Sequence, residues 1–272
     1  MSASDVAALV PCHEELPAAS LLDAIAGRVG SVLVVGDGLP ESALEPLTGR
    51  SGSPIDILPL PRRSGKGTAV AAGIERLLAR PLPPTAVLVV DGDGQHPPEA
   101  IPSFLAAAAS SELVIGDRFG DLSAMPLHRR LGNLVACGIV AAVSRRRMRD
   151  TQCGMRLLRG RALHELPVPR GGYEAETRHL LRCVAAGVTL AWVPIPSLYD
   201  GEPSSFRPVR DSLRVLRAIV AASPPAWTPS AAARALLALV ALGLEPQAGE
   251  AVEDEVADRE ERRQRHERLR GP

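Results

Sequence analysis

Five short apolar runs, separated by segments with helical spacing, organise the first half of the chain. The runs cover residues 6–10, 31–35, 56–58, 86–90 and 112–116. Strands of a parallel sheet are buried on both faces and read as continuous apolar runs, and helices fill the crossovers between them. Between the third and fourth runs, Val70, Ile74 and Leu77 recur at the spacing of one helix face. The pattern predicts an α/β fold with a mainly parallel central sheet and flanking helices.

The second half of the chain is less regular. Its predicted elements are a helix over 128–146, a strand or loop over 150–158, a helix over 173–186 that stops at Gly187, a strand over 188–195 and a helix near 210–222. From Ser223 the composition changes to a linker with two prolines, an apolar stretch and a charged tail. We therefore expect one folded domain over 1–222 and a C-terminal apolar helix with a charged tail over 223–272.

The charge balance and the cysteines restrict the class of protein. Lys and Arg together number 31, as do Asp and Glu, so the chain lacks the basic surplus that is typical of nucleic-acid binders. The four cysteines form no CxxC pair, which fits a reducing compartment. We expect a cytoplasmic protein that has no nucleic-acid partner.

Neither end of the chain shows the pattern of a membrane-spanning signal. The N-terminus has no basic region before its short apolar run, so it reads as a strand and not as a signal peptide. The apolar stretch 231–244 is interrupted by Arg234 and is shorter than the roughly 20 residues that cross a bilayer. A helix that closes the domain surface and a helix that lies on the inner face of the cell membrane both remain open for this stretch.

The fourth apolar run leads into a turn with two carboxylates. Asp91 and Asp93 alternate with Gly92 and Gly94, and Gln95 follows. Open parallel sheets bind ligands at the carboxyl edge of their strands. Two carboxylates and an amide oxygen on a tight turn could hold a hard cation such as Mg2+ or Mn2+, which would stabilise a departing diphosphate.

Similar turns occur in other kinds of site. An EF-hand loop requires Asp or Asn at the position of Gln95 and Gly at the position of His96, so the sequence excludes it. A phosphatase with Asp91 as its nucleophile uses a similar aspartate pair. An ordinary Asp-Gly turn is also common in loops. The last two interpretations remain open from these residues alone.

A glycine-rich segment with a lysine precedes the third predicted helix. Residues 62–74 resemble a phosphate loop, but the first glycine of that motif is missing and Gly67 stands where Ser or Thr must follow the lysine. The segment is therefore not a nucleotide-binding P-loop. Lys66 could still face an anion at the helix N-terminus, and a solvent-exposed lysine on a turn is the alternative.

Eight short segments follow one another in a fixed order along the chain. They read VPCHEELP, VVGDGLP, RRSGKGTAVAAGI, VVDGDGQHPPEAIP, IGDRFG, DTQCGMRLL, YEAET and VPIPSLYDGEPSSFRPVRDSLR. This series resembles the family 2 glycosyltransferases over residues 6–222 and is most similar to their polyprenyl-phosphate mannose and glucose synthase branch. The resemblance implies a GT-A fold and an inverting sugar transfer from a GDP- or UDP-sugar with Mg2+ or Mn2+. The implied acceptor is polyprenyl phosphate, with a soluble hydroxyl acceptor as the alternative.

The resemblance assigns a donor site residue by residue. The implied nucleotide contacts are Pro11, His13, Glu15 and Asp37, and the implied metal ligands are Asp91, Asp93 and Gln95. The predicted donor contacts also include Lys66, Arg118, Ser205, Arg207 and Arg210. Three positions depart from the family pattern, because His13 replaces an aromatic residue, Glu14 replaces an asparagine and Gly36 replaces the first of two aspartates. A non-catalytic sugar-nucleotide binder is therefore a further alternative.

The acceptor side is assigned in the same way. Arg129, Arg130 and Arg156 are candidates for contact with a lipid phosphate, and a solvated helix face explains the first two as well. Asp150 is the candidate base for a hydroxyl acceptor, and a turn or helix-cap aspartate is its alternative role. A lipid monophosphate is already anionic and needs no strong base. Asp150, Asp93 and Arg118 form the predicted catalytic set.

Three further polar residues are given roles outside chemistry. His96 is predicted to support the carboxylate turn, because the neighbouring oxygens suit a hard cation better than an imidazole does. Glu174 and Glu176 lie too far apart around their helix to share a face. Glu174 is expected to form an i,i+4 pair with Arg178.

Overall fold

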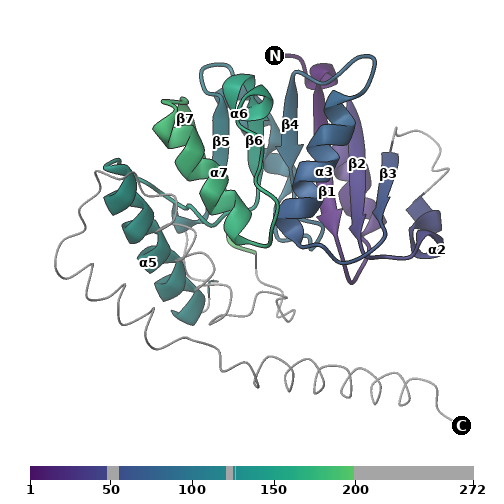
Figure 1. Ribbon diagram of the computed structural model, residues 1–272, viewed down its shortest axis with the longest axis horizontal. Helices are drawn as coiled ribbons and strands as arrows, with labels where there is room; N and C mark the ends of the chain where they lie inside the picture. The colour runs from purple at the N-terminus through teal and green to yellow at the C-terminus, as the bar shows by residue number, and fades with distance from the viewer. Residues whose placement is uncertain (48–54, 121–124, 126, 199–272) are drawn as a thin grey trace, which may run out of the picture. The chain divides into compact units, whose positions relative to one another are not determined.

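The computed structural model describes residues 1–47, 55–120, 125 and 127–198 (Figure 1). The predicted helix near 210–222, the predicted domain boundary after 222 and the predicted tail lie outside these residues. The same holds for three predicted donor contacts, Ser205, Arg207 and Arg210.

A seven-stranded sheet forms the centre of the described fold. Its strands are β1 (Val6–Cys12), β2 (Ser31–Asp37), β3 (Ile55–Leu60), β4 (Ala86–Val89), β5 (Leu113–Asp117), β6 (Arg156–Arg159) and β7 (Leu190–Pro194). They are ordered β3-β2-β1-β4-β6-β5-β7, and every neighbouring pair is parallel except the two that involve β6. The register places Leu9 of β1 opposite Leu33 of β2 and Val89 of β4. The predicted α/β fold with a mainly parallel sheet is confirmed.

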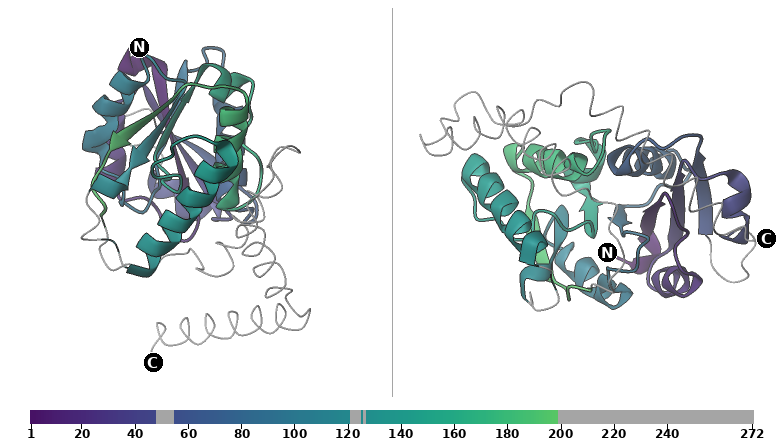
Figure 2. Two further views of the ribbon diagram at one scale, coloured as in Figure 1. Left: turned by 90° about the vertical axis from the view of Figure 1, so that its left-hand side faces the viewer. Right: turned by 90° about the horizontal axis from the view of Figure 1, so that it is seen from below.

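Helices cover both faces of this sheet (Figure 2). The helices are α1 (Ala19–Ala26), α2 (Glu41–Leu44), α3 (Lys66–Leu78), α4 (Ile101–Ala107), α5 (Leu127–Ser144), α6 (Gly160–His164) and α7 (Glu174–Ala185). Short 3-10 turns are η1 (Ala3–Asp5), η2 (Glu45–Leu47), η3 (Pro98–Ala100) and η4 (Arg118–Gly120). The helices α3 and α7 lie on one face, and α1 and α4 lie on the other. Within the described ranges, no helix combines the length and the apolar character that a membrane crossing requires.

The burial pattern explains why the apolar runs form central strands. Side chains of β1, β2, β4 and β5 are buried on both faces of the sheet, as the continuous apolar runs predict. Between the layers, Phe104 of α4 and Leu77 of α3 are fully buried. The edge strand β3 is less buried, with Asp56 and Pro59 exposed and its other residues half-buried. The core therefore lies in the middle of the sheet and holds its strand ends in fixed positions.

The second half of the chain follows the predicted order of elements. The predicted helices over 128–146 and 173–186 correspond to α5 and α7, and Gly187 has the left-handed φ of 70° that suits a residue after a helix. The ambiguous segment over 150–158 is a loop followed by β6. Its antiparallel direction was not predicted, because alternating strands and helices favour parallel pairing.

Candidate functional site at the carboxyl edge of the sheet

The topology gathers several chain segments at the carboxyl edge of the parallel strands. β1, β2 and β4 are parallel, so the residues after each strand leave the sheet on the same side. β6 runs antiparallel to β4 and β5, so the segment before it, residues 149–155, reaches the same edge. The N-terminus of α3 also lies there, because α3 follows the parallel strand β3. The carboxylate turn after β4 is therefore surrounded by three other segments.

The turn itself has the tight geometry that its glycines predict. Gly94 has a φ of 75°, a backbone conformation that residues with a Cβ rarely adopt. The backbone N–H of Gln95 donates to Asp93 Oδ1 at 3.0 Å. Asp93 is exposed, whereas the Asp91 side chain is 21% exposed. The two carboxylates of the turn therefore differ in environment, with Asp93 facing solvent and Asp91 facing the protein.

Asp91 is held by a lysine that also contacts a glutamate. Lys66 Nζ lies 2.6 Å from Asp91 Oδ1 and 2.9 Å from Glu176 Oε1. Lys66 is the first residue of α3 and Glu176 lies in the first turn of α7, so the ammonium joins two helix N-termini to the turn after β4. Lys66 thus binds two carboxylates of the protein. No sequence pattern predicts the contact of Glu176 with Lys66, because it depends on how α7 packs against α3.

The charges of this cluster shift its pKa values in opposite directions. Burial raises the pKa of the Asp91 carboxyl, but the nearby positive charges, with Lys66 the strongest, outweigh burial and hold that pKa below its ordinary value. Burial lowers the pKa of Lys66, but Asp91 and Glu176 outweigh it and raise that pKa. Asp91 is therefore an anion and Lys66 a cation at neutral pH.

Tight backbone packing fixes the position of this cluster. A Cβ on Gly154 would lie 2.2 Å from Asp91 Oδ2 and 2.6 Å from Lys66 Nζ, so only glycine fits there without a shift. A Cβ on Gly67 would lie 2.2 Å from the Cβ of Ala175 at the start of α7. The close approach of these segments leaves the charged groups little freedom to rearrange.

Asp37 holds the loop that leads into α3. The backbone N–H groups of Ser64 and Gly65 donate to the two oxygens of Asp37 at 2.7 and 2.8 Å. Asp37 is 4% exposed and lies at the end of β2. In this structure, the carboxylate predicted to contact the nucleotide supports the backbone immediately before Lys66.

His96 occupies the supporting position that was predicted for it. It is 3% exposed, its Nδ1 lies 3.7 Å from Asp91 Oδ2, and its Nε2 lies 3.7 Å from Cys153 Sγ. Burial is the main cause that lowers the pKa of the imidazole, which stays neutral at pH 7. The ring packs behind the turn, between Asp91 and the 149–155 segment.

Arg118 and Asp150, two members of the predicted catalytic set, contact each other directly. Arg118 Nε donates to Asp150 Oδ2 at 2.5 Å, and Nη2 donates to Oδ1 at 3.0 Å. The side chain of Asp150 has no exposed surface. A base must reach the proton that it removes, so this arrangement does not support the predicted base role of Asp150.

Arg156 does not have the environment of an acceptor-binding residue. It is 3% exposed, and its guanidinium donates to the carbonyl oxygens of Cys153, Thr151 and Glu176, each at 2.8 Å. These bonds tie the 149–155 segment to the first turn of α7. The donors of Arg156 are directed at backbone oxygens, so these contacts do not support the predicted lipid-phosphate contact.

The remaining predicted residues are spread around the edge. Pro11 is half-buried and Glu15 is exposed after β1, and the His13 side chain is 28% exposed with its Nε2 3.9 Å from Glu14 Oε1. Arg130 is exposed on α5, and Arg129 belongs to the same helix. Lys66 contacts Asp91, the charge of Arg118 acts on Asp91 and His96, and that of Asp93 acts on His96 at this edge, whereas Arg130 is a surface residue.

The donor set of the turn fits a hard divalent cation. The three carboxylates of Asp91, Asp93 and Glu176 outnumber the two cations, Lys66 and Arg118, so the cluster has excess negative charge. Among the described residues, no group of three or more His, Cys, Asp or Glu side chains converges as a metal site. The protein would therefore supply Asp91, Asp93 and the amide oxygen of Gln95, and phosphate oxygens or water would complete the coordination.

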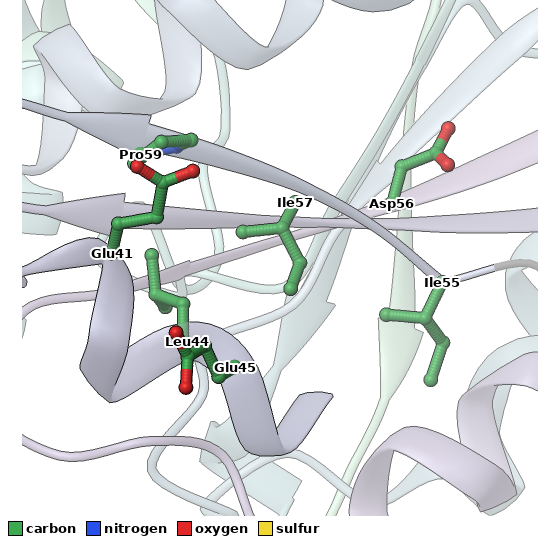
Figure 3. Close-up of a pocket in the computed structure, with 7 residues that line it drawn as sticks. All are labelled: Glu41, Leu44, Glu45, Ile55, Asp56, Ile57 and Pro59. Atoms are coloured by element: carbon green, nitrogen blue, oxygen red, sulfur yellow. The ribbon is translucent and has the colours of Figure 1, made fainter. Parts of the chain in front are cut away.

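Two cavities of the described fold lie away from this cluster. One of about 420 Å³ lies between α2 and β3 and is lined by Glu41, Leu44, Glu45, Ile55, Asp56, Ile57 and Pro59 (Figure 3). Its lining includes three acidic side chains and no basic side chain that could bind a diphosphate. A second, lined by residues such as Asp5 and Thr85, lies where β1 and β4 begin, at the opposite edge of the sheet. Neither cavity suits a sugar-nucleotide donor.

Comparison with known proteins identifies a family over more than half of the chain. The model described as Glycosyl transferase family 2 matches residues 8–166. An uncharacterized protein of Methanocaldococcus jannaschii is 25% identical over 142 residues, which are 49% of this chain and 61% of that protein. The match thus covers less than two thirds of the relative's length.

Solved structures with a similar fold include mycobacterial proteins. Glucosyl-3-phosphoglycerate synthase from Mycobacterium tuberculosis, in complex with Mn2+, UDP and phosphoglyceric acid, superposes with a TM-score of 0.62 at 19% identity and covers 83% of this chain and 80% of that chain. A further mycobacterial protein gives 0.64 at 18% identity, with coverage of 81% and 76%. The synthase with Mg2+ and UDP gives 0.54 at 17% identity, with coverage of 81% and 80%. At these identities the likeness concerns the fold, and the predicted GT-A fold is confirmed.

Proposed function

Because the chain belongs to glycosyl transferase family 2, we propose that it transfers a sugar from a nucleotide-diphosphate donor to an acceptor, with inversion and with Mg2+ or Mn2+. The observation that carries this proposal is the carboxylate turn at the carboxyl edge of β4, with Lys66 Nζ 2.6 Å from Asp91 Oδ1. The solved structures of similar fold that contain UDP with Mn2+ or Mg2+ support it. The family match argues against the phosphatase alternative for Asp91.

Each residue of the cluster has a role in this proposal. Asp91, Asp93 and Gln95 would hold the cation, which when bound neutralises charge on the departing diphosphate. Lys66 and Glu176 fix the carboxylate of Asp91. Arg118 lies at the same edge, and a guanidinium matches the geometry of a phosphate oxygen pair. Fixed donors of this kind stabilise developing charge without having to reorganise during the reaction.

Two acceptors are supported by different observations. Polyprenyl phosphate follows from the likeness of DGDGQHPP and its neighbouring segments to the polyprenyl-phosphate synthases. A small phosphorylated hydroxyl compound follows from the similar fold of a synthase that was crystallised with phosphoglyceric acid. Both acceptors carry phosphate, which suits the guanidinium of Arg118 at this edge. A lipid acceptor would imply a cytoplasmic enzyme at the inner face of the cell membrane, and a small acceptor would not require that location.

The experiment is nucleotide release from a panel of GDP-, UDP- and dTDP-sugars. Each donor is incubated with Mn2+, Mg2+ or a chelator, and with a short polyprenyl phosphate, phosphoglycerate or no acceptor. Release that requires a metal and one acceptor supports the transferase and names its substrates. Binding of a nucleoside diphosphate without transfer to any acceptor would favour the non-catalytic binder. Metal-independent release of phosphate from simple phosphomonoesters would contradict the proposal.

A further inference from the structure

Two ion pairs join the end of β5 to the 149–155 segment. The arginine of one pair lies in the 149–155 segment, and the arginine of the other pair directly follows β5. Arg149 Nη1 donates to Asp117 Oδ2 at 2.9 Å, and Arg118 Nε donates to Asp150 Oδ2 at 2.5 Å. The outer pair is open to solvent through Arg149, whose side chain is 63% exposed. The inner pair is enclosed, because the Asp150 side chain is completely buried and that of Arg118 is 14% exposed. The chain therefore offers an inner pair and an outer pair at the same strand end.

The described contacts of the Asp150 carboxylate are all with groups of the protein. Its Oδ1 accepts from Arg118 Nη2 at 3.0 Å and from the backbone N–H of Gln152 at 3.1 Å. Its Oδ2 accepts from Arg118 Nε and, at 3.3 Å, from the backbone N–H of Arg118. Both oxygens are thus engaged. A buried carboxylate that forms a two-pronged contact with a guanidinium fixes the plane of that guanidinium.

The neighbours of Asp150 are held independently of its charge. The backbone N–H of Thr151 donates to Cys137 Sγ at 3.3 Å, which ties the segment to α5. Arg156 Nη2 donates to the carbonyl oxygen of Thr151 at 2.8 Å, which ties it to β6. A substitution of equal shape at Asp150 would therefore leave these hydrogen bonds of the segment in place.

The inner pair lies close to the carboxylate turn. Gly154, in the same segment, packs so closely that a Cβ would lie 2.2 Å from Asp91 Oδ2. Arg118 is one of the charges that act on Asp91. A guanidinium fixed at this place is within the electrostatic field of the site in which the proposed donor would bind.

We propose that Asp150 is a positioning residue that acts through Arg118, by orienting its guanidinium toward a phosphate group of the substrate. This inference rests on the proposed function, because the phosphate belongs either to the sugar-nucleotide donor or to a phosphorylated acceptor. It replaces the base role predicted for Asp150. A rigid guanidinium loses less freedom on binding phosphate than a mobile one does, so the pair increases affinity without a proton transfer.

A double-mutant cycle tests this role. The variants are Asp150→Asn, which keeps the shape and removes the charge, Arg118→Gln, and the combination of both. Arg149→Gln is the matched control, because it breaks the outer pair at the same strand end. The measurements are the KM for donor and for acceptor separately, kcat against pH, and calorimetric binding of UDP and GDP with Mn2+.

The expected result is coupling between the two residues. Asp150→Asn should raise the KM for one phosphate-bearing substrate about tenfold or more, as expected for a charge-assisted contact. The KM of the double variant should equal that of Arg118→Gln to within about twofold, because Asp150 acts through Arg118. The pH profile of kcat should keep its acidic limb, and Arg149→Gln should leave KM unchanged. The substrate whose KM rises identifies the phosphate.

Other outcomes overturn the inference. Asp150→Asn could instead lower kcat and remove the acidic limb of its pH profile, with an effect that adds to that of Arg118→Gln. This result would show that Asp150 is a base. If Asp150→Asn does not fold, Arg118→Lys keeps the charge without the fork, and a wild-type KM in that variant would also overturn it. The wild type could bind UDP or GDP but transfer no sugar, while the variants lose this binding in the coupled way. That result would retain the inference and reject the proposed function. A wild-type chain that binds neither nucleotide would contradict both.

Discussion

Lys66 Nζ lies 2.6 Å from Asp91 Oδ1, and this contact joins the start of α3 to the turn after β4. The side chains of Lys66 and Asp91 are 13% and 21% exposed, so water screens the pair less than it would on the surface. Glu176 Oε1 contacts the same ammonium at 2.9 Å. The lysine is therefore shared between a carboxylate of the proposed metal site and one that stands behind it.

Removal of the charge of Glu176 should weaken the site. Glu176→Gln leaves a partly buried ammonium with one carboxylate and reduces the negative charge around the turn. We expect a loss of at least about tenfold in kcat/KM at limiting Mn2+ and a decrease of roughly 1–3 kcal/mol in the free energy of unfolding. Mn2+ titration and urea unfolding measure the two effects.

Glu174→Gln is the matched control for this substitution. Glu174 Oε1 accepts from the backbone N–H of Gly172 at 3.0 Å, and a glutamine oxygen can accept the same bond. We expect near wild-type Mn2+ dependence for this variant. Equal losses in both variants would mean that the charge of α7, and not the contact with Lys66, is responsible.

Gly154 is expected to tolerate no side chain. In Gly154→Ala, the new Cβ would lie 2.2 Å from Asp91 Oδ2, so either the turn or the 149–155 segment must move. We expect at least about tenfold lower transfer activity and a destabilisation of roughly 1–3 kcal/mol, as for other overpacked sites. Steady-state kinetics and thermal unfolding provide the readouts.

Gly138→Ala provides the opposite case. A Cβ at this position in α5 meets nothing within 4 Å, and alanine is the better helix former. The variant should be more stable than the wild type by about 0.5–1 kcal/mol and equally active. If Gly154→Ala behaved like Gly138→Ala, the close packing around Asp91 would be without consequence.

Asp93 should be necessary for metal-dependent turnover but not for folding. Its side chain is exposed, and its contact with the backbone N–H of Gln95 can be kept by an asparagine oxygen. The unfolding temperature of Asp93→Asn should therefore lie within a few degrees of that of the wild type. Its activity with Mn2+ should fall at least about a hundredfold, as expected for a lost charged ligand. Full activity in this variant would reject the assignment of Asp93 to the metal site.

The acid sensitivity of the fold should depend on Glu112. Its Oε1 and Oε2 accept from Arg161 Nε at 3.1 Å and from Nη2 at 2.9 Å. These hydrogen bonds lower the pKa of the Glu112 carboxyl from 4.5 to about 2. Because the pKa is lower in the folded state, this group stabilises the fold above pH 4.5, and the stabilisation is lost as the pH falls toward 2.

The measurement is urea unfolding of the wild type and Glu112→Gln from neutral pH down to about 2. The wild type should be the more stable protein at neutral pH, and the difference should shrink below pH 4.5. Glu75→Gln removes a pair whose two side chains are 57% and 63% exposed, and it should change stability little at any pH. A constant difference between wild type and Glu112→Gln across the range would contradict the assignment.

The order of the elements and the carboxylate turn could be predicted from local sequence. Continuous apolar runs identify strands that are buried on both faces, and Gly94 marks a turn that requires a positive φ. Asp91 and Asp93 follow such a strand, so their place at the carboxyl edge follows from the topology of parallel sheets. Each of these predictions depends on residues that are neighbours in the chain.

The partners of the charged residues could not be predicted in this way. The sequence shows that Lys66, Glu176, Arg118 and Asp150 exist, but which carboxylate binds which cation depends on the packing of α3 against α7 and on the antiparallel strand β6. Local sequence suggests a base role for Asp150 and an acceptor contact for Arg156, and it contains no sign that both side chains are buried. Burial and pairing are properties of distant segments brought together, so the amino-acid sequence determined the strands and the turn, and only the tertiary structure decided which charges the turn would meet.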